Sequence, residues 1–213
     1  MAATNGRNKD HPTFEEPAFE PYALAIGRLA LAWNDLHERL ATLFCTVLGS
    51  ESLDRAIAVW NSATFDRARR EMFKSAALAI SLTDLSKFPK MADELKWLCD
   101  RVDNFENIRN DAIHSPLLLN RVTLLPLLIF GHSDIVAPND LLHNTRASRL
   151  VGKDLLSEFN WCYHSVIVLR DYAAIINQAL TADAVPWPER PALPNRPQQN
   201  QRRKGMPAAH CKE

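Results

Sequence analysis

The chain has 213 residues, of which 46% are hydrophobic and 23% charged, a composition typical of a globular protein with a substantial core. Its formal net charge is zero, so any contact with nucleic acid has to come from a local patch and not from a basic body. The four cysteines are widely spaced and form no C-x-x-C pair, which argues against a zinc site and indicates a reducing compartment. We therefore expect a cytoplasmic protein that binds no metal and no other cofactor.

The chain begins with a polar, proline-containing stretch, residues 1–21, that lacks the apolar centre of a signal peptide and is expected to be a flexible arm. A helix is then predicted over residues 22–48, with Gly49 as its stop, because apolar residues recur at spacings of three and four. That row consists of Ile26, Leu29, Trp33, Leu36, Leu40, Leu43 and Val47. A short helix over residues 53–60 and a longer one over residues 65–82 follow. The inward row of the longer helix is expected to be Phe65, Ala68, Met72, Ala76 and Ala79.

Residues 89–114 form the next predicted helix, whose first residue is a proline that suits a first turn. Residues 117–150, approximately, break the helical pattern and are typical of a hairpin or extended flap, in a stretch too interrupted to span a bilayer. A last helix over residues 153–180 precedes residues 181–213, which have the proline-rich composition of a disordered tail. We therefore predict an all-α protein, an up-and-down helical bundle over residues 22–180 with an insertion after its third long helix.

One residue interrupts the apolar pattern of the helix over residues 89–114. The inward row runs through Met91, Leu95, Leu98, Val102, Phe105 and Ala112. Arg109 occupies the position between the last two, where a guanidinium is costly unless something pairs with it. A neighbouring row contains Asp103, Asn107, Asn110 and His114, so the helix brings Arg109, Asn110 and His114 toward one edge. A plain structural explanation stays open, in which the arginine snorkels to the helix end and the histidine caps the last carbonyls.

Residues 109–114 (Arg-Asn-Asp-Ala-Ile-His), at the end of a long helix in an all-helical chain, resemble the Arg-polar-x3–5-His motif of the HEPN superfamily of nucleotide-binding helical domains. The stretch Trp33-Asn34-x-x-His37-Glu38 is also similar to the first helix of bacterial HEPN-like proteins. The resemblance covers roughly residues 22–180, although only the six-residue motif is specific and the insertion departs from the minimal family pattern. It implies a homodimer whose two motif copies meet across the interface. Many such proteins are metal-independent ribonucleases that act as toxins or in anti-phage defence, whereas others only bind nucleotides or RNA.

The chemistry of RNA cleavage suits the motif residues. Without a metal, a base must take the proton of the ribose 2′-OH, and His114 can serve because histidine titrates close to neutral pH. Arg109 offers a planar fork that matches phosphate oxygens, and Asn110 shares a helical face with His114 and can orient its imidazole. Arg109 and His114 are five positions apart, about 140° around an ideal helix, so they converge poorly within one copy. This difficulty favours a two-fold site shared between copies.

Other polar residues are weaker candidates. His37, Glu38 and Asn107 could support the site as neighbours of the motif, although a solvated helix face explains them equally well. Four basic residues of the helix over residues 65–82 could contact RNA phosphates, although such a face is usually only solvated. These residues are Arg67, Arg69, Arg70 and Lys74.

The leading hypothesis from the sequence is a dimeric, metal-independent HEPN-type endoribonuclease that cleaves RNA by 2′-OH attack, with a role as a toxin or defence protein. A toxin would also imply an antitoxin partner. Two alternatives stay open because fold-level similarity does not determine function. One is a non-catalytic nucleotide- or RNA-binding regulatory protein of the same family. The other is a structural helical dimer in which Arg109 only tethers two helices.

Overall fold

The structure is a computed structural model that describes residues 17–49, 52–80, 87–115, 149–150, 153–182 and 185–198, with the backbone of 118–119 and 135–136. The protein is all-α, as the sequence predicts. Its described elements begin with a 3-10 turn, η1 (Pro17–Phe19), and continue with the helices α1 (Glu20–Leu48), α2 (Leu53–Ser62), α3 (Asp66–Leu78), α5 (Met91–His114) and α7 (Leu155–Thr181). None of these helices is both long enough and apolar enough to cross a lipid bilayer.

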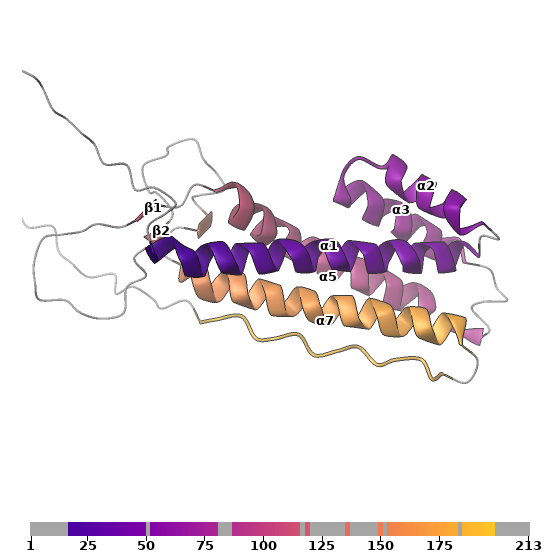
Figure 1. The fold of residues 1–213 in the computed structure, drawn as a ribbon. Coiled ribbons are helices and arrows are strands. Elements are labelled where there is room, and N and C mark those ends of the chain that lie inside the picture. Colours follow the sequence, from indigo (N-terminus) through magenta and orange to yellow (C-terminus); the bar gives the residue numbers. More distant parts are fainter. Residues whose placement is uncertain are drawn as a thin grey trace, which may run out of the picture.

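The three long helices α1, α5 and α7 lie side by side and alternate in direction along the chain (Figure 1). Thr46, near the end of α1, donates a hydrogen bond to Asn177, near the end of α7, at 2.6 Å, so these two helices run parallel. Glu94, near the start of α5, accepts a hydrogen bond of 2.9 Å from Tyr172 in the second half of α7, so α5 runs the opposite way. The shorter helices cover one end of the bundle, with α2 against α1 and α3 against both α1 and α5.

The core is built from the predicted apolar rows of the long helices, with α1 and α5 both packed against α7. Both rows are largely buried, with Leu29, Trp33, Leu36, Leu40 and Leu43 in α1 and Met91, Leu95, Leu98, Val102, Phe105 and Ala112 in α5. The predicted stop of α1 is also confirmed. Gly49 adopts a left-handed φ of 58°, which costs glycine little, and its N–H donates to the Thr46 carbonyl at 3.1 Å.

The face that α3 buries differs from the predicted one. Phe65 is 72% exposed and Ala68 is exposed, whereas Arg70, Phe73 and Ala77 are buried. Of the predicted row only Met72 and Ala76 are half-buried against the core. The prediction was wrong for the rest of the row because it assigned every charged residue to the solvent side. Arg70 is paired with carboxylates of α5, so it turns inward and sets the buried face of the whole helix.

The structure of the segments that flank the bundle agrees only partly with the predictions from the sequence. β1 (Leu118–Leu119) pairs antiparallel with β2 (Ile135–Val136), in agreement with a hairpin within the insertion. The remainder of residues 117–148 lies outside the described residues. Residues 17–21, assigned to the flexible arm, instead form η1 and the start of α1, because Phe19 is buried against the core. Residues 1–16 lie outside the described residues.

Residues 185–198 were predicted to belong to a disordered tail, and the structure shows that this prediction was wrong. They form an extended segment, which we call the strap, that runs back along α7 (Figure 1). The strap is fastened by arginines at positions 190 and 196, which pair with carboxylates of α5 and α7. Composition predicted disorder because few strap residues are apolar, and composition does not reveal that its arginines meet buried partners. Residues 199–213 lie outside the described residues.

Candidate functional site

The motif occupies the last turns of α5, at the end of the bundle where β1 and β2 lie (Figure 1). The helix ends at His114, and Ser115 turns to an extended conformation (φ −84°, ψ 136°) because a proline follows it. Asp111, within the motif, is buried and is bound through both carboxylate oxygens by Arg149, which lies just before α7. Sequence reasoning missed Arg149, since a partner 38 positions away leaves no local signal. This contact fastens the motif helix to the chain that enters α7.

The guanidinium of Arg109 lies over the indole ring of Trp33 in α1, with its central carbon 5.7 Å from the ring centroid. Its Nη1 donates a hydrogen bond of 2.9 Å to Oδ1 of Asn110, so the structure brings these two predicted site residues together. Its Nε is buried and meets no acceptor among the described residues. The Trp33 indole in turn donates to Asp66 of α3 at 2.9 Å. Arg109 is therefore half-buried, held against an aromatic ring, and incompletely hydrogen-bonded.

Arg70, from α3, has the opposite character. It is fully buried, and each of its three nitrogens makes a polar contact. Its Nε donates to Asp103 at 2.6 Å, its Nη2 to Glu106 at 2.8 Å, and its Nη1 lies 3.1 Å from Nε2 of His37. Burial alone would raise the pKa of Asp103, but the hydrogen bonds from Lys74 and Arg70 outweigh it and hold that pKa below its ordinary value. A buried cation is tolerated here because two carboxylates and an imidazole satisfy it.

The imidazole of His37 is used structurally. Its Nδ1 lies 3.0 Å from the carbonyl oxygen of Trp33, which can only accept, so Nδ1 carries the proton and donates. Its Nε2 then accepts from Arg70. Burial is the largest influence on this group and, with the positive charges of Arg70 and Arg69, lowers the pKa of His37 despite the nearby carboxylate of Asp66. Because the lone pair of Nε2 already accepts a hydrogen bond from Arg70, His37 cannot act as a general base toward a substrate.

Two arginines therefore approach the same indole ring, and their hydrogen bonding separates their roles. Arg70 lies 5.8 Å from the Trp33 centroid and is saturated by side chains of the protein. Arg109 lies 5.7 Å from it and has the single hydrogen bond to its neighbour Asn110 among the described residues. The saturated arginine joins α1, α3 and α5, whereas the unsaturated one has donors left for a ligand.

The remaining predicted site residues are exposed. His114 lies on the surface at the end of α5, and no hydrogen bond within the described part of the chain joins it to Arg109. Asn107 on α5 and Glu38 on α1 are also exposed. One copy of the chain therefore assembles Arg109 with Asn110, but it leaves the histidine apart, as the helical spacing of the two residues implies.

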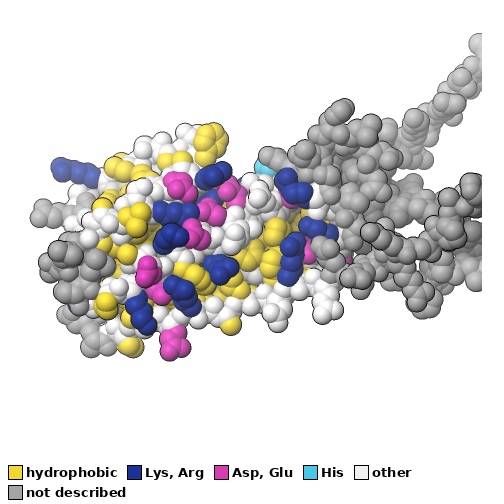
Figure 2. Space-filling view, turned by 180° about the vertical axis from the view of Figure 1, so that it is seen from behind, with side chains coloured by type: hydrophobic (Ala, Val, Ile, Leu, Met, Phe, Trp, Pro, Cys, Tyr) yellow, Lys and Arg dark blue, Asp and Glu magenta, His cyan; other side chains and the backbone are white. Residues whose placement is uncertain are grey.

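The basic residues of α3 do not form a common surface. Arg70 is buried, and Arg69 donates to the Ala63 carbonyl at 3.2 Å. Lys74 contacts three carboxylates within 3.2 Å, and these hydrogen bonds raise its pKa against the opposing effect of burial. Arg67 alone of the four is exposed. Figure 2 shows acidic and basic side chains interspersed on the face that it displays, so a phosphate backbone would find no continuous basic track there.

Two further carboxylates belong to the site and were not predicted. Asp66 accepts the Trp33 indole hydrogen bond and lies 3.9 Å from Nε2 of His37. Burial would raise the pKa of Asp66, but His37, the indole N–H and the nearby arginines lower it overall. Glu106 binds Arg70. The spacing of Asp103 and Glu106, three apart on one helix face, was the available signal, since such a pair can bind one guanidinium from a neighbouring helix.

Comparisons of the chain with known protein families, with curated proteins and with solved structures found no match.

Proposed function

We propose that the chain is a metal-independent endoribonuclease of the HEPN type whose site is completed by a second copy of the chain. The observation that carries this proposal is that Arg109, beside the saturated Arg70, is incompletely hydrogen-bonded among the described residues, where its buried Nε has no acceptor. An unmet buried N–H costs about 1–3 kcal/mol, and structural arginines normally avoid it. A planar cation with spare donors, backed by an aromatic ring, is suited to phosphate.

The proposed reaction is an internal transfer of the phosphodiester. His114 of one copy removes the proton of a ribose 2′-OH, and the 2′-oxygen attacks the adjacent phosphorus. Arg109 stabilises the negative charge that develops on the phosphoryl oxygens. The bond to the 5′-oxygen breaks, and this oxygen takes a proton from water. The products are a 2′,3′-cyclic phosphate and a free 5′-hydroxyl, so neither a metal nor an oxidant is required.

The site is proposed to be composite because Arg109 and His114 are about 140° apart around one helix. In a two-fold dimer, Arg109 of one copy can face His114 of the other, and the arrangement occurs twice. The network around Arg70 supports this arrangement indirectly. It fixes α5 against α1 and α3, so that the motif end of α5 is held in one position.

The test is cleavage of single-stranded RNA by the full chain and three variants. Arg109→Lys and His114→Ala should each lose activity, because an ammonium lacks the bidentate fork and an alanine lacks the base. His164→Ala is the matched control, since His164 is also exposed, on α7, and should leave activity unchanged. Cleavage should survive EDTA and fail on 2′-deoxy substrates. Activity that requires magnesium, or that cuts DNA equally well, would overturn the mechanism.

A mixing experiment tests the composite site separately. When the Arg109→Lys and His114→Ala proteins are unfolded, mixed and refolded together, half of the dimers carry one copy of each. One of the two sites in such a dimer regains both intact residues. About a quarter of the wild-type activity should therefore return, as two-fold symmetry requires. If both residues act within one copy, no activity returns.

A second candidate function is a non-catalytic RNA- or nucleotide-binding protein. It is favoured by the separation of His114 from Arg109 within one copy, which leaves a cation for phosphate without a base beside it. The folded dimer would then bind RNA without cutting it, and Arg109→Lys would weaken binding while His114→Ala would not.

For the ribonuclease, we propose a role as a toxin or in anti-phage defence. A toxin would act together with an antitoxin that restrains it.

A further inference from the structure

The strap has a three-residue periodicity in its contacts. Every third residue from Trp187 faces the bundle, and these residues are Trp187, Arg190, Leu193 and Arg196. The prolines at 188, 191, 194 and 197 are half-buried beside them. The third set, at 186, 189, 192, 195 and 198, is exposed throughout. A period of three is that of a polyproline II helix, which the fixed φ of proline and the restriction on preceding residues both favour.

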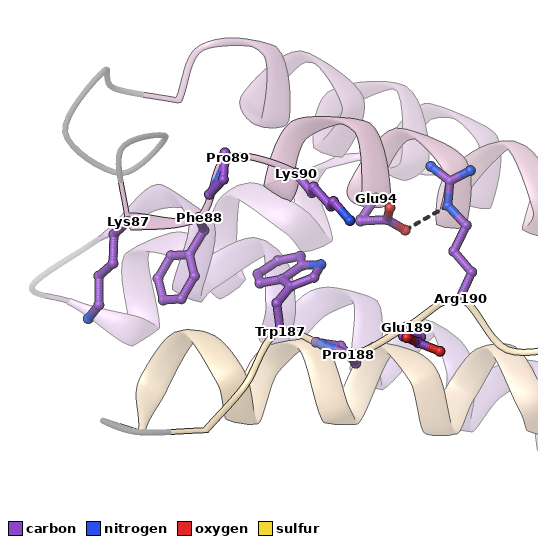
Figure 3. A pocket seen from close by; sticks show the side chains of 9 residues that line it. All are labelled: Lys87, Phe88, Pro89, Lys90, Glu94, Trp187, Pro188, Glu189 and Arg190. Carbon is purple, nitrogen blue, oxygen red and sulfur yellow. Dashed lines mark hydrogen bonds and ion pairs between the residues drawn. The ribbon is translucent and has the colours of Figure 1, made fainter.

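The surface under the strap is an aromatic groove with two buried carboxylates. At one end Trp187 lies 5.5 Å from Phe88, and Arg190 reaches Glu94 beside it (Figure 3). Arg190 also lies over Trp97, with its central carbon 5.4 Å from the ring centroid. Together these contacts make one end of the groove a pocket for an aromatic residue followed, three positions later, by a cation.

The other end of the groove repeats the contact of a strap arginine with a glutamate and a tryptophan, with Leu193 in place of the aromatic residue three positions before the arginine. Arg196 binds both oxygens of Glu158, at 2.7 Å through Nη2 and 3.1 Å through Nε, and lies 5.1 Å from the centroid of Trp161. The Trp161 indole donates to the backbone carbonyl of Pro194 at 2.8 Å. An indole that donates to a carbonyl of a polyproline II strand is a recurrent way for proteins to read proline-rich peptides.

The two carboxylates give the groove its register. Glu94 and Glu158 are 7% and 3% exposed, and within the described residues their cationic partners come from the strap. Their arginines are six residues apart, which corresponds to about 19 Å in polyproline II. The arginine side chains remain 46% and 43% exposed. The two buried carboxylates thus determine where the strap arginines bind, but the strap itself lies on the surface, outside the packed core.

We propose that this groove between α5 and α7 is a binding site for a proline-rich polypeptide strand with arginines six residues apart, and that the strap is its intramolecular ligand. A separate strand of the same chemistry competes for the groove. The linkage to α7 gives the strap a high effective concentration, on the order of millimolar for short connections, so the groove is normally filled from within. This inference is independent of the proposed ribonuclease activity.

The experiment measures binding of a fluorescently labelled peptide of residues 185–198 to the full-length chain by anisotropy. Arg190→Ala/Arg196→Ala in the protein weakens the resident strap and should tighten peptide binding at least tenfold relative to the wild type. Trp187→Ala, which loosens the strap without removing either arginine, should act in the same direction. Glu189→Gln/Asn195→Ala, on the exposed face of the strap, is the matched control and should bind like the wild type. Circular dichroism verifies that each variant is folded.

Two control peptides complete the design. One carries glutamate at both arginine positions, and the other has the same composition in scrambled order. Neither should bind the Arg190→Ala/Arg196→Ala protein measurably. Equal binding of the scrambled peptide would reduce the interaction to general charge attraction and overturn the proposal. So would a folded Arg190→Ala/Arg196→Ala protein and a folded Trp187→Ala protein that bind the native peptide no better than the wild type does.

Discussion

Replacing Arg70 by methionine removes the cation at the centre of the α1–α3–α5 junction while keeping a side chain of similar length. Asp103, Glu106 and Nε2 of His37 then lose hydrogen bonds of 2.6, 2.8 and 3.1 Å. Removing one partner of a buried ion pair typically costs 3–5 kcal/mol. We expect a cost at the lower end of this range, because the side chains of Asp103 and Glu106 are 28% and 26% exposed and can recover some hydration. Lys74 also stays on Asp103.

We therefore expect a loss of about 3 kcal/mol in the free energy of unfolding, or about 6–12 °C in Tm for a chain of this size. Urea unfolding followed by tryptophan fluorescence measures it, since Trp33 lies within the junction. Arg67→Met is the control, because Arg67 is exposed on the same helix and should change stability by less than about 0.5 kcal/mol. An Arg70→Met protein as stable as the wild type would refute the assignment of a structural role to this residue.

Three further outcomes follow from the structure. The pKa of His37 is lowered from 6.5 in the fold, so the unfolded chain takes up the proton first and stability falls as the pH drops below about 6.5, until the folded pKa is reached. His37→Gln should show a smaller loss of urea stability between pH 8 and pH 5, and identical losses would contradict the neutral, buried imidazole. The thiols of Cys45, Cys99 and Cys162 are buried, which raises their pKa, to about 12 for the last two, so Ellman's reagent should reach them only on unfolding. Fast reaction of any of these three thiols in the native chain would be incompatible with that burial. Sedimentation at micromolar concentration should give twice the chain mass, whereas a clean monomer would remove the basis for a shared site.

The apolar rows of the long helices were predictable because their side chains alternate at three and four over many turns. That pattern identified Trp33 and Phe105 as core residues and located Arg109 as the exception in the row. The buried face of α3 was not predictable in this way. Its central residue is Arg70, and a rule based on hydrophobicity places arginine in solvent unless its partners on another helix are known.

The candidate site was predicted in part for the same reason. Local spacing placed Arg109, Asn110 and His114 toward one edge of the helix, and in the structure the side chains of Arg109 and Asn110 are hydrogen-bonded to each other. The roles of His37 and Asp66 depend on how three helices meet, which no local pattern encodes. The strap presents a related case. Its prolines were read as a sign of disorder, whereas the same prolines favour the one extended conformation that fits a groove formed by two distant helices.

The ion pair between Asp111 and Arg149 has a consequence for how this protein can be altered. It joins the last turn of the motif helix to the chain just before α7, so the stretch between them begins and ends at a fixed clasp. The entropic cost of closing a loop grows slowly, by about 0.6 kcal/mol for each doubling of its length. Segments of different length and composition can therefore be grafted between Ser115 and Arg149 with little effect on the geometry of Arg109. The clasp thus holds the motif end of α5 in place whatever the length of the chain that connects it to Arg149.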